Sequence, residues 1–305
     1  MNSQAGAATD SELDAAAAEI RSMDPQGLRS ARVLRDTFDQ LYDGSRTGRY
    51  RWDQLYSTER RLGGNLVEIN LQREFGFQDG TKANFQIAGI DVDFKYSQAL
   101  GGWMIPPEAH GHLCLLLWAD DAISKWSMGV VRTTVDRLNT GGNIDREAML
   151  NQEGRAAITW LFDHAPLPPN VLLQLDREKV NRIMALKSGV RKVNELFRVD
   201  LGMRVGRAVV ATVGEQADYM RRIRYNGGAR GYLQPEGIII LGQYKSHLAV
   251  AGALGLPLPR PGESVSARIA PAEAPGPGVA EINARLWRLA KPGDTIVPAP
   301  ILPET

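Results

Sequence analysis

The chain has 305 residues, long enough for two domains with separate cores, and its 43% hydrophobic and 23% charged residues are typical of a globular protein. A formal net charge of +1 excludes general adhesion to nucleic acid, so any nucleic-acid surface must be a local basic face. The single cysteine, Cys114, excludes an intrachain disulfide, and no apolar run is long enough to span a bilayer. We therefore expect a soluble cytoplasmic protein that does not bind membranes.

Three helical patterns open the chain. The first two are DSELDAAAAEIRSM, residues 10–23, and PQGLRSARVLRDTFDQLYDG, residues 25–44, which Gly44 would end. The third is STERRLGGNLVEINLQREF, residues 57–75, with Glu68 beside its apolar stripe. The predicted stripe consists of Leu66, Ile69 and Phe75.

Four strand-like runs follow the third helix. They are NFQIAG (84–89), IDVDFKYS (90–97), HLCLLLWAD (112–120) and KWSMGVVR (125–132). Little more than Gly89 separates the first two, which predicts a tight hairpin. His110, His112 and Cys114 alternate along one stretch, but ligands from a single extended strand diverge. A zinc site is therefore not favoured there, and Cys114 is expected to be a small buried residue.

The second of these strands, IDVDFKYS, carries its charges at alternate positions. Successive side chains of a strand point to opposite faces, so Asp91, Asp93 and Lys95 share one face and the apolar residues share the other. Taken alone, the pattern fits a half-exposed strand with a solvated charged face. It also fits the strand of PD-(D/E)xK nucleases, where an acid, a spacer and a lysine put carboxylate oxygens beside a positive group. The preceding acid-bearing helix and the hairpin favour the nuclease.

The character of the chain changes after residue 160. The proline-containing segment DHAPLPPN, residues 163–170, predicts a linker between two domains. Beyond it we expect two strands, GRAVVATV (206–213) and GIIILG (237–242), a helix QADYMRRIR (216–224) between them, and a late helix AEINARLWRLA (280–290).

Residues 176–200 read as two short helices joined by a turn that contains glycine, with Asp176 capping the first and Ser188 the second. This pattern is that of a helix-turn-helix, whose second helix would enter a major groove, and equally that of a structural helical hairpin. The basic residues expected to be exposed on the second helix are Arg191, Lys192 and Arg198.

A basic, glycine-containing stretch, MRRIRYNGGARGYLQPEG, lies further along, at residues 220–237. Backbone N–H groups and guanidinium groups in such a loop can approach phosphate closely, although a solvated basic helix end has the same composition. Next to a helix-turn-helix candidate, phosphate binding is favoured. The residues expected to bind DNA here are Arg221, Arg222, Arg224, Gly227, Gly228 and Arg230.

Several of these stretches, from about residue 30 to the end and in the same order, resemble those of the NaeI-type (type IIE) restriction endonucleases. They are VLRDTFDQLYDGSRTGR, NLVEINLQREF, WMIPPEAHGHLCLLLWA, RKVNELFR, GRAVVATV and NGGARGYLQPEGIIILG. The resemblance implies a mixed α/β protein with an N-terminal domain at 1–162, whose PD-(D/E)xK core lies at about 58–132. After the linker it implies a DNA-binding domain at 171–305 that resembles the catabolite activator protein.

Residue by residue, the resemblance implies that Glu68, Asp93 and Lys95 are catalytic. The match breaks at Asn84, where the family has its first metal-binding aspartate, and a neutral amide oxygen weakens a magnesium site. We hypothesise that Asp91, on the same strand face as Asp93, supplies the missing charge. The expected ligands of Mg²⁺, or of Mn²⁺ in its place, are Asp93, the Phe94 carbonyl, and Asn84 or Asp91.

The same resemblance implies the function and its partners. The implied function is site-specific hydrolysis of duplex DNA by in-line displacement at a GC-rich palindrome such as GCCGGC. The implied enzyme is a homodimer that binds a second DNA copy as effector. A cognate DNA methyltransferase is expected genetically and not as a complex. The alternative is a sequence-specific DNA-binding protein on a weakened nuclease scaffold. Asn84 favours this alternative, and the retained Asp93 and Lys95 favour the nuclease.

Overall fold

The computed structural model describes residues 10–141 and 146–303, which divide into two compact units. Unit 1 consists of the residues up to Leu41 and of Leu55–Pro169, and unit 2 consists of Tyr42–Gln54 and the residues from Asn170 onward. Both units contain helices and strands, which confirms the mixed α/β class. No helix in the described residues is long and apolar enough to cross a membrane.

Unit 1 is built on a six-stranded sheet with the order β1-β2-β3-β4-β5-β6. The strands are β1 (Gln78–Asp79), β2 (Phe85–Ile87), β3 (Ile90–Ser97), β4 (Leu113–Asp120), β5 (Lys125–Arg132) and β6 (Thr159–Pro166). Only β3 and β4 pair in parallel, and the other neighbours are antiparallel. The four predicted strands are confirmed. Ala88 and Gly89, with φ of 53° and 75°, form the predicted two-residue hairpin turn, in which both residues take left-handed conformations.

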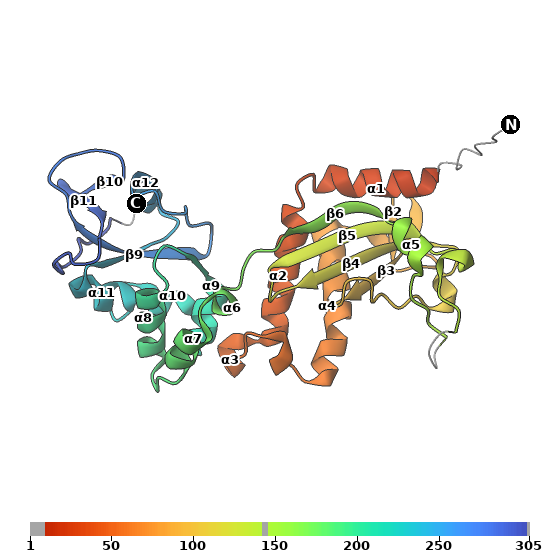
Figure 1. The fold of residues 1–305 in the computed structure, drawn as a ribbon, viewed down its shortest axis with the longest axis horizontal. Helices are drawn as coiled ribbons and strands as arrows, with labels where there is room; N and C mark the ends of the chain where they lie inside the picture. The colour runs from red at the N-terminus through yellow and green to blue at the C-terminus, as the bar shows by residue number, and fades with distance from the viewer. Residues whose placement is uncertain (1–9, 142–145, 304–305) are drawn as a thin grey trace. The chain divides into compact units, whose positions relative to one another are not determined.

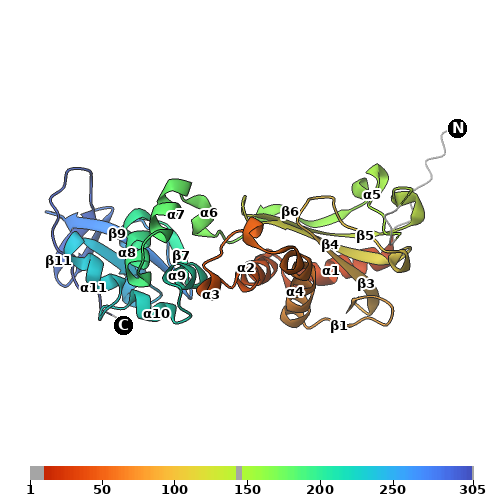
Figure 2. The ribbon, with the colours of Figure 1, turned by 90° about the horizontal axis from the view of Figure 1, so that it is seen from below.

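Helices cover both faces of this sheet. Its helices are α1 (Ser11–Met23), α2 (Leu28–Tyr42), α4 (Ser57–Phe75) and the short α5 (Gln152–Ala156), with the 3₁₀ turns η2 (Pro107–Ala109) and η3 (Val135–Arg137). Figures 1 and 2 show α1, α2 and α4 on one face and α5 on the other. Strand β4 is apolar and buried along nearly its whole length because both of its faces are covered.

The buried side of α4 differs from the predicted stripe. Gly63, Val67 and Leu71 are buried at i, i+4 and i+8, whereas Ile69 is 40% exposed. The prediction followed the largest apolar side chains, but the helix packs through smaller residues. A Cβ on Gly64 would lie only 3.9 Å from the Cβ of Tyr96 on β3, so the helix backbone runs close to the sheet. This close approach brings Glu68 near the β2–β3 hairpin.

Unit 2 contains a second sheet, with the order β10-β11-β9-β7 and with β8 also paired to β9. Its strands are β7 (Arg204–Gly206), β8 (Ile238–Leu241), β9 (Glu263–Pro271), β10 (Val279–Ile282) and β11 (Arg285–Leu289). Its helices are α3 (Gly44–Thr47), η1 (Trp52–Gln54), α6 (Val171–Gln174), α7 (Arg177–Met184), α8 (Gly189–Val199), α9 (Arg207–Gly214), α10 (Tyr219–Ile223), α11 (Ala229–Leu233), η4 (Gln234–Glu236) and α12 (Lys245–Ala253). Strand β8 separates two cores. Ile238 and Ile240 pack with helices α8 to α11, and Ile239 and Leu241 pack with α12 and the β10–β11 hairpin.

Two predicted elements of unit 2 are wrong. GRAVVATV was expected to be a strand because of its β-branched residues, but α9 is a helix whose buried Val209, Val210 and Val213 follow helical spacing. AEINARLWRLA was expected to be a helix, but it is the β10–β11 hairpin, turned by Asn283 and Ala284 in left-handed conformations. In both cases tertiary packing overrides local propensity.

The unit boundaries also differ from the predicted domains. Residues 42–54 lie in unit 2 although the sequence placed them in the 1–162 domain, and the first half of the predicted linker 163–170 belongs to strand β6. Asn170 donates to the Tyr50 carbonyl at 3.0 Å. A Cβ on Gly44 would lie 2.0 Å from the hydroxyl of Thr212, so only glycine fits where this segment packs on α9.

A buried cation joins helix α2 to the turn after β4. Arg35 pairs with Asp121, whose side chain is 3% exposed, and with Asp39 at 2.8 Å. We expect Arg35→Met to destabilise the protein by about 3 kcal/mol, because it leaves a buried carboxylate without its cation. Urea unfolding monitored by circular dichroism measures this. Arg32→Met on the same helix, where the side chain is 64% exposed, serves as control and is expected to change stability by less than about 0.5 kcal/mol. Equal effects of the two substitutions would contradict the prediction.

Candidate active site

Strand β3 places Asp93 and Lys95 on the same face, as its alternation predicts. Asp93 is 8% exposed, and Lys95 is half-buried beside it. The Lys95 Nζ atom lies 2.9 Å from Asp93 Oδ2, and Asp93 Oδ1 accepts the N–H of Phe94 at 3.0 Å. The Phe94 ring packs against Phe85 in the core, with the two rings tilted by 46°. The strand thus combines a buried apolar face with a paired acid and base.

Asn84 connects this strand to helix α4. Its amide group donates to Glu68 Oε1 at 2.6 Å, and its Oδ1 accepts the N–H of Phe94 at 2.8 Å. The two contacts fix which end of the amide is oxygen, because a backbone N–H can only donate. Glu68, Asn84 and strand β3 are therefore brought together, with Glu68 held by a neutral amide rather than facing a second carboxylate.

Asp91 does not take the place expected of it. Its two oxygens accept the backbone N–H groups of Thr81 and Lys82, each at 3.0 Å, so it closes the loop before β2. Asp91 shares a strand face with Asp93, but it does not line the pocket into which Asp93 opens. The physical reason is that nearby unpaired backbone donors form stronger contacts with the carboxylate than open solvent does.

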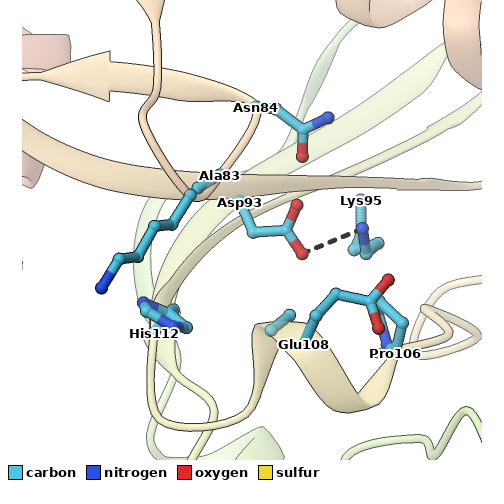
Figure 3. Close-up of a pocket in the computed structure, with 9 residues that line it drawn as sticks. Ala83, Asn84, Asp93, Lys95, Pro106, Glu108 and His112 are labelled. Carbon is cyan, nitrogen blue, oxygen red and sulfur yellow. Dashed lines mark ion pairs between the residues drawn. The ribbon is translucent and has the colours of Figure 1, made fainter.

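A pocket of about 270 Å³ lies over Asp93 and Lys95. Figure 3 shows its lining residues. They are Lys82, Ala83, Asn84, Asp93, Lys95, Pro106, Glu108, Ala109 and His112. Sequence reasoning did not select Lys82, Glu108 or His112 as site residues. The available signal for Glu108 and His112 was that PPEAHGH lies between the β2–β3 hairpin and β4, within the stretch WMIPPEAHGHLCLLLWA that carries the family resemblance.

The donors in this pocket fit a divalent cation. Asp93 and Glu108 supply carboxylate oxygens, which hard cations such as Mg²⁺ prefer. No set of three or more Asp, Glu, His or Cys side chains converges on a metal position within the described residues. Mg²⁺ does not need such a set, because it is commonly held by one or two carboxylates, with water and substrate phosphate completing its shell.

The predicted DNA-binding residues of unit 2 fall into two groups. Arg191, Arg221, Arg224 and Gly227 are exposed, and Arg222 is partly exposed. The remaining three are buried: Lys192, Gly228 and Arg230. Lys192 forms an ion pair with Glu215, and Arg230 donates to the Ile240 carbonyl at 3.0 Å.

The second predicted helix of the helix-turn-helix, α8, is mainly a core helix. Val193, Leu196 and Phe197 on it are fully buried. Arg198, which the sequence placed at the surface, is half-buried and pairs with Glu236 at 2.7 Å. Asp176 caps α7 as predicted, but the side chain of Ser188 makes no cap hydrogen bond.

Comparison with known proteins gives a consistent result over nearly the whole chain. The family model of the restriction endonuclease NaeI matches residues 14–298. The type II restriction enzyme NaeI of Lentzea aerocolonigenes is 48% identical over 302 residues, which cover 96% of this chain and 95% of that protein. The chain therefore belongs to the NaeI family of restriction endonucleases and is a type II site-specific deoxyribonuclease.

Proposed function

We propose that this enzyme cuts duplex DNA at a GC-rich palindrome, and that unit 1 is its PD-(D/E)xK nuclease core with the reaction centred on Asp93 and Lys95. The observation that carries this proposal is the 2.9 Å pair of a lysine and a largely buried carboxylate at the wall of an open pocket. Burying a charge is costly unless it is paired, so the pair offsets the cost of holding an acid and a lysine where a phosphate can reach them.

Each residue of the pocket has a separate task in this proposal. Asp93 and the backbone carbonyl of Phe94 would hold Mg²⁺ or Mn²⁺. When bound, the ion would lower the pKa of its water and neutralise phosphate charge. Lys95 donates hydrogen bonds to the attacking water or to the oxygens that gain charge during in-line displacement. Lys82 is exposed at the pocket and can contact a neighbouring phosphate. Asn84 positions Glu68 and strand β3 through its two hydrogen bonds.

Unit 2 is proposed to bind DNA, including a second, effector copy of the site. Its resemblance to the catabolite activator protein is part of this proposal. Arg221 and Arg224 are exposed on helix α10 and directly after it, and α9 and α10 are joined by a short turn at residues 215–218. Either this pair of helices or the α7–α8 pair, on which Arg182 and Arg191 are exposed, could present basic residues to a groove. A homodimer would match a two-fold symmetric site. A cognate methyltransferase would be a genetic partner only.

A slower enzyme that mainly holds DNA is the second candidate, and Asn84 is the observation that favours it. A neutral amide replaces a carboxylate at this position, and its oxygen already accepts a backbone N–H. The pocket then attracts a divalent cation less strongly than one with an aspartate there.

Loss of the lysine tests the proposed centre. We expect Lys95→Ala to lower the cleavage rate of a supercoiled plasmid with GCCGGC sites by about 100-fold or more in Mg²⁺, because one preorganised donor to developing charge is worth about that factor. Binding of the same DNA in EDTA is expected to stay within a few-fold of the parent. Cutting by Lys95→Ala at the parental rate would contradict the proposal, whereas binding without cutting by the parent in Mg²⁺ and Mn²⁺ would favour the second candidate.

The role of Asp91 gives a separate prediction. Because Asp91 binds backbone N–H groups of the 81–82 loop, we expect Asp91→Ala to cut within about tenfold of the parental rate and to lose about 1–2 kcal/mol of unfolding free energy. Plasmid cleavage and urea unfolding measure the two effects. A loss of cleavage as large as that of Asp93→Ala, without loss of stability, would restore Asp91 as a metal ligand.

The basic surface of α10 predicts the salt dependence of binding. For Arg221→Ala and Arg224→Ala we expect weaker DNA binding and a slope of log K against log salt smaller by about 1 for each lost phosphate contact. Fluorescence anisotropy with a labelled duplex in EDTA measures this slope. Arg285→Ala, which removes an exposed arginine on β11, is the matched control and should leave the slope unchanged. An unchanged slope in the two α10 variants would place the DNA elsewhere.

A further inference from the structure

We infer that Glu108 is the second carboxylate of the metal site and substitutes for the acid that is absent at position 84. Of the nine residues that line the pocket, Asp93 and Glu108 are the two with carboxylates. Figure 3 shows Glu108 extending from η2 toward the space that Asp93 and Lys95 face. The inference rests on the proposed function in taking this pocket as the site of phosphodiester hydrolysis.

The other acids near the hairpin are already engaged. Glu68 accepts the amide of Asn84 at 2.6 Å, and Asp91 accepts two backbone N–H groups. Asp79, on strand β1, accepts the amide of Gln72 at 2.6 Å. None of these three lines the pocket. A cation that enters the pocket therefore meets Asp93 and Glu108 without displacing an existing hydrogen bond of another acid.

The backbone around Glu108 is fixed, while its carboxylate is free. Pro106 and Pro107 lead into η2, and the buried Ala109 ends it. The Ala109 carbonyl accepts the hydroxyl of Thr133 at 2.5 Å, and the Ala109 N–H donates to Pro106 at 3.0 Å. Glu108 itself is exposed, and its carboxylate has no hydrogen-bond or ion-pair partner in the described part of the chain. A rigid base under an unpaired carboxylate suits a ligand that binds from solution.

Charge balance in the pocket supports the same assignment. The charges of Asp93, Glu108 and Lys95 sum to one net negative charge. The exposed Lys82 is left out of this sum because it can face the substrate phosphate. An aspartate at 84 would instead place a second carboxylate beside Glu68, where the two charges repel each other unless a bound cation offsets them. Moving the second carboxylate to η2 avoids that repulsion and still supplies the two protein carboxylates that Mg²⁺ commonly uses.

The experiment measures Mn²⁺ binding to the full chain, without DNA, by electron paramagnetic resonance titration. We expect one saturable Mn²⁺ site per chain, weakened about tenfold or more in Glu108→Gln, since even groups that only support a metal ligand contribute tenfold or more to affinity. Glu281→Gln, at an exposed position on β10, removes the same charge and is expected to leave Mn²⁺ binding unchanged. Circular dichroism melting verifies that each variant is folded.

A double variant tests the substitution itself. Asn84→Asp in the Glu108→Gln background returns a carboxylate to position 84, and we expect it to regain Mn²⁺ affinity. Parental affinity in Glu108→Gln, no saturable site in the parent, or no recovery in the folded double variant would each overturn the inference. Plasmid cleavage is scored separately. Mn²⁺ binding that depends on Glu108 in a protein that does not cut DNA would defeat the proposed function and leave the metal site in place.

Discussion

The arrangement of the catalytic region depends on one side chain, the amide of Asn84. It donates to Glu68 on helix α4 and accepts the backbone N–H of Phe94 on strand β3, so a single group ties the helix to the hairpin. An amide can do both because it carries a donor and an acceptor, whereas a carboxylate only accepts. An ionised aspartate there would accept from Phe94 but repel Glu68. The asparagine that we propose weakens the metal site is therefore also a structural connection.

The charged face of β3 is stable because each of its charges has a partner. Asp93 is nearly buried and pairs with Lys95. Asp91 accepts hydrogen bonds from backbone N–H groups of the preceding loop. Next to β3, the mostly apolar β4 pairs in parallel and anchors the strand in the sheet. The rigid sheet thus holds an acid and a lysine at fixed separation against an open pocket, which is what preorganised catalysis requires.

Much of unit 1 could be predicted from local pattern. The helices, the four strands, the two-residue hairpin and the shared face of Asp93 and Lys95 all follow from short-range periodicity and turn chemistry. Unit 2 was harder to predict. Its α9 has β-branched residues but packs as a helix, and the β10–β11 hairpin has a helix-like composition. At these positions burial against several elements outweighs a propensity difference of less than about 1 kcal/mol per residue.

By itself, the sequence determined which residues could supply the chemistry: the alternation that pairs Asp93 with Lys95, and the asparagine at 84. Only the tertiary structure decided what those residues contact. It directed Asp91 to the backbone of a loop, buried Lys192 and Arg230 inside unit 2, and brought Glu108 from a separate turn to the pocket of Asp93. The reason is that alternation along a strand acts over a few residues, whereas the partner of a carboxylate depends on which distant segment folds beside it.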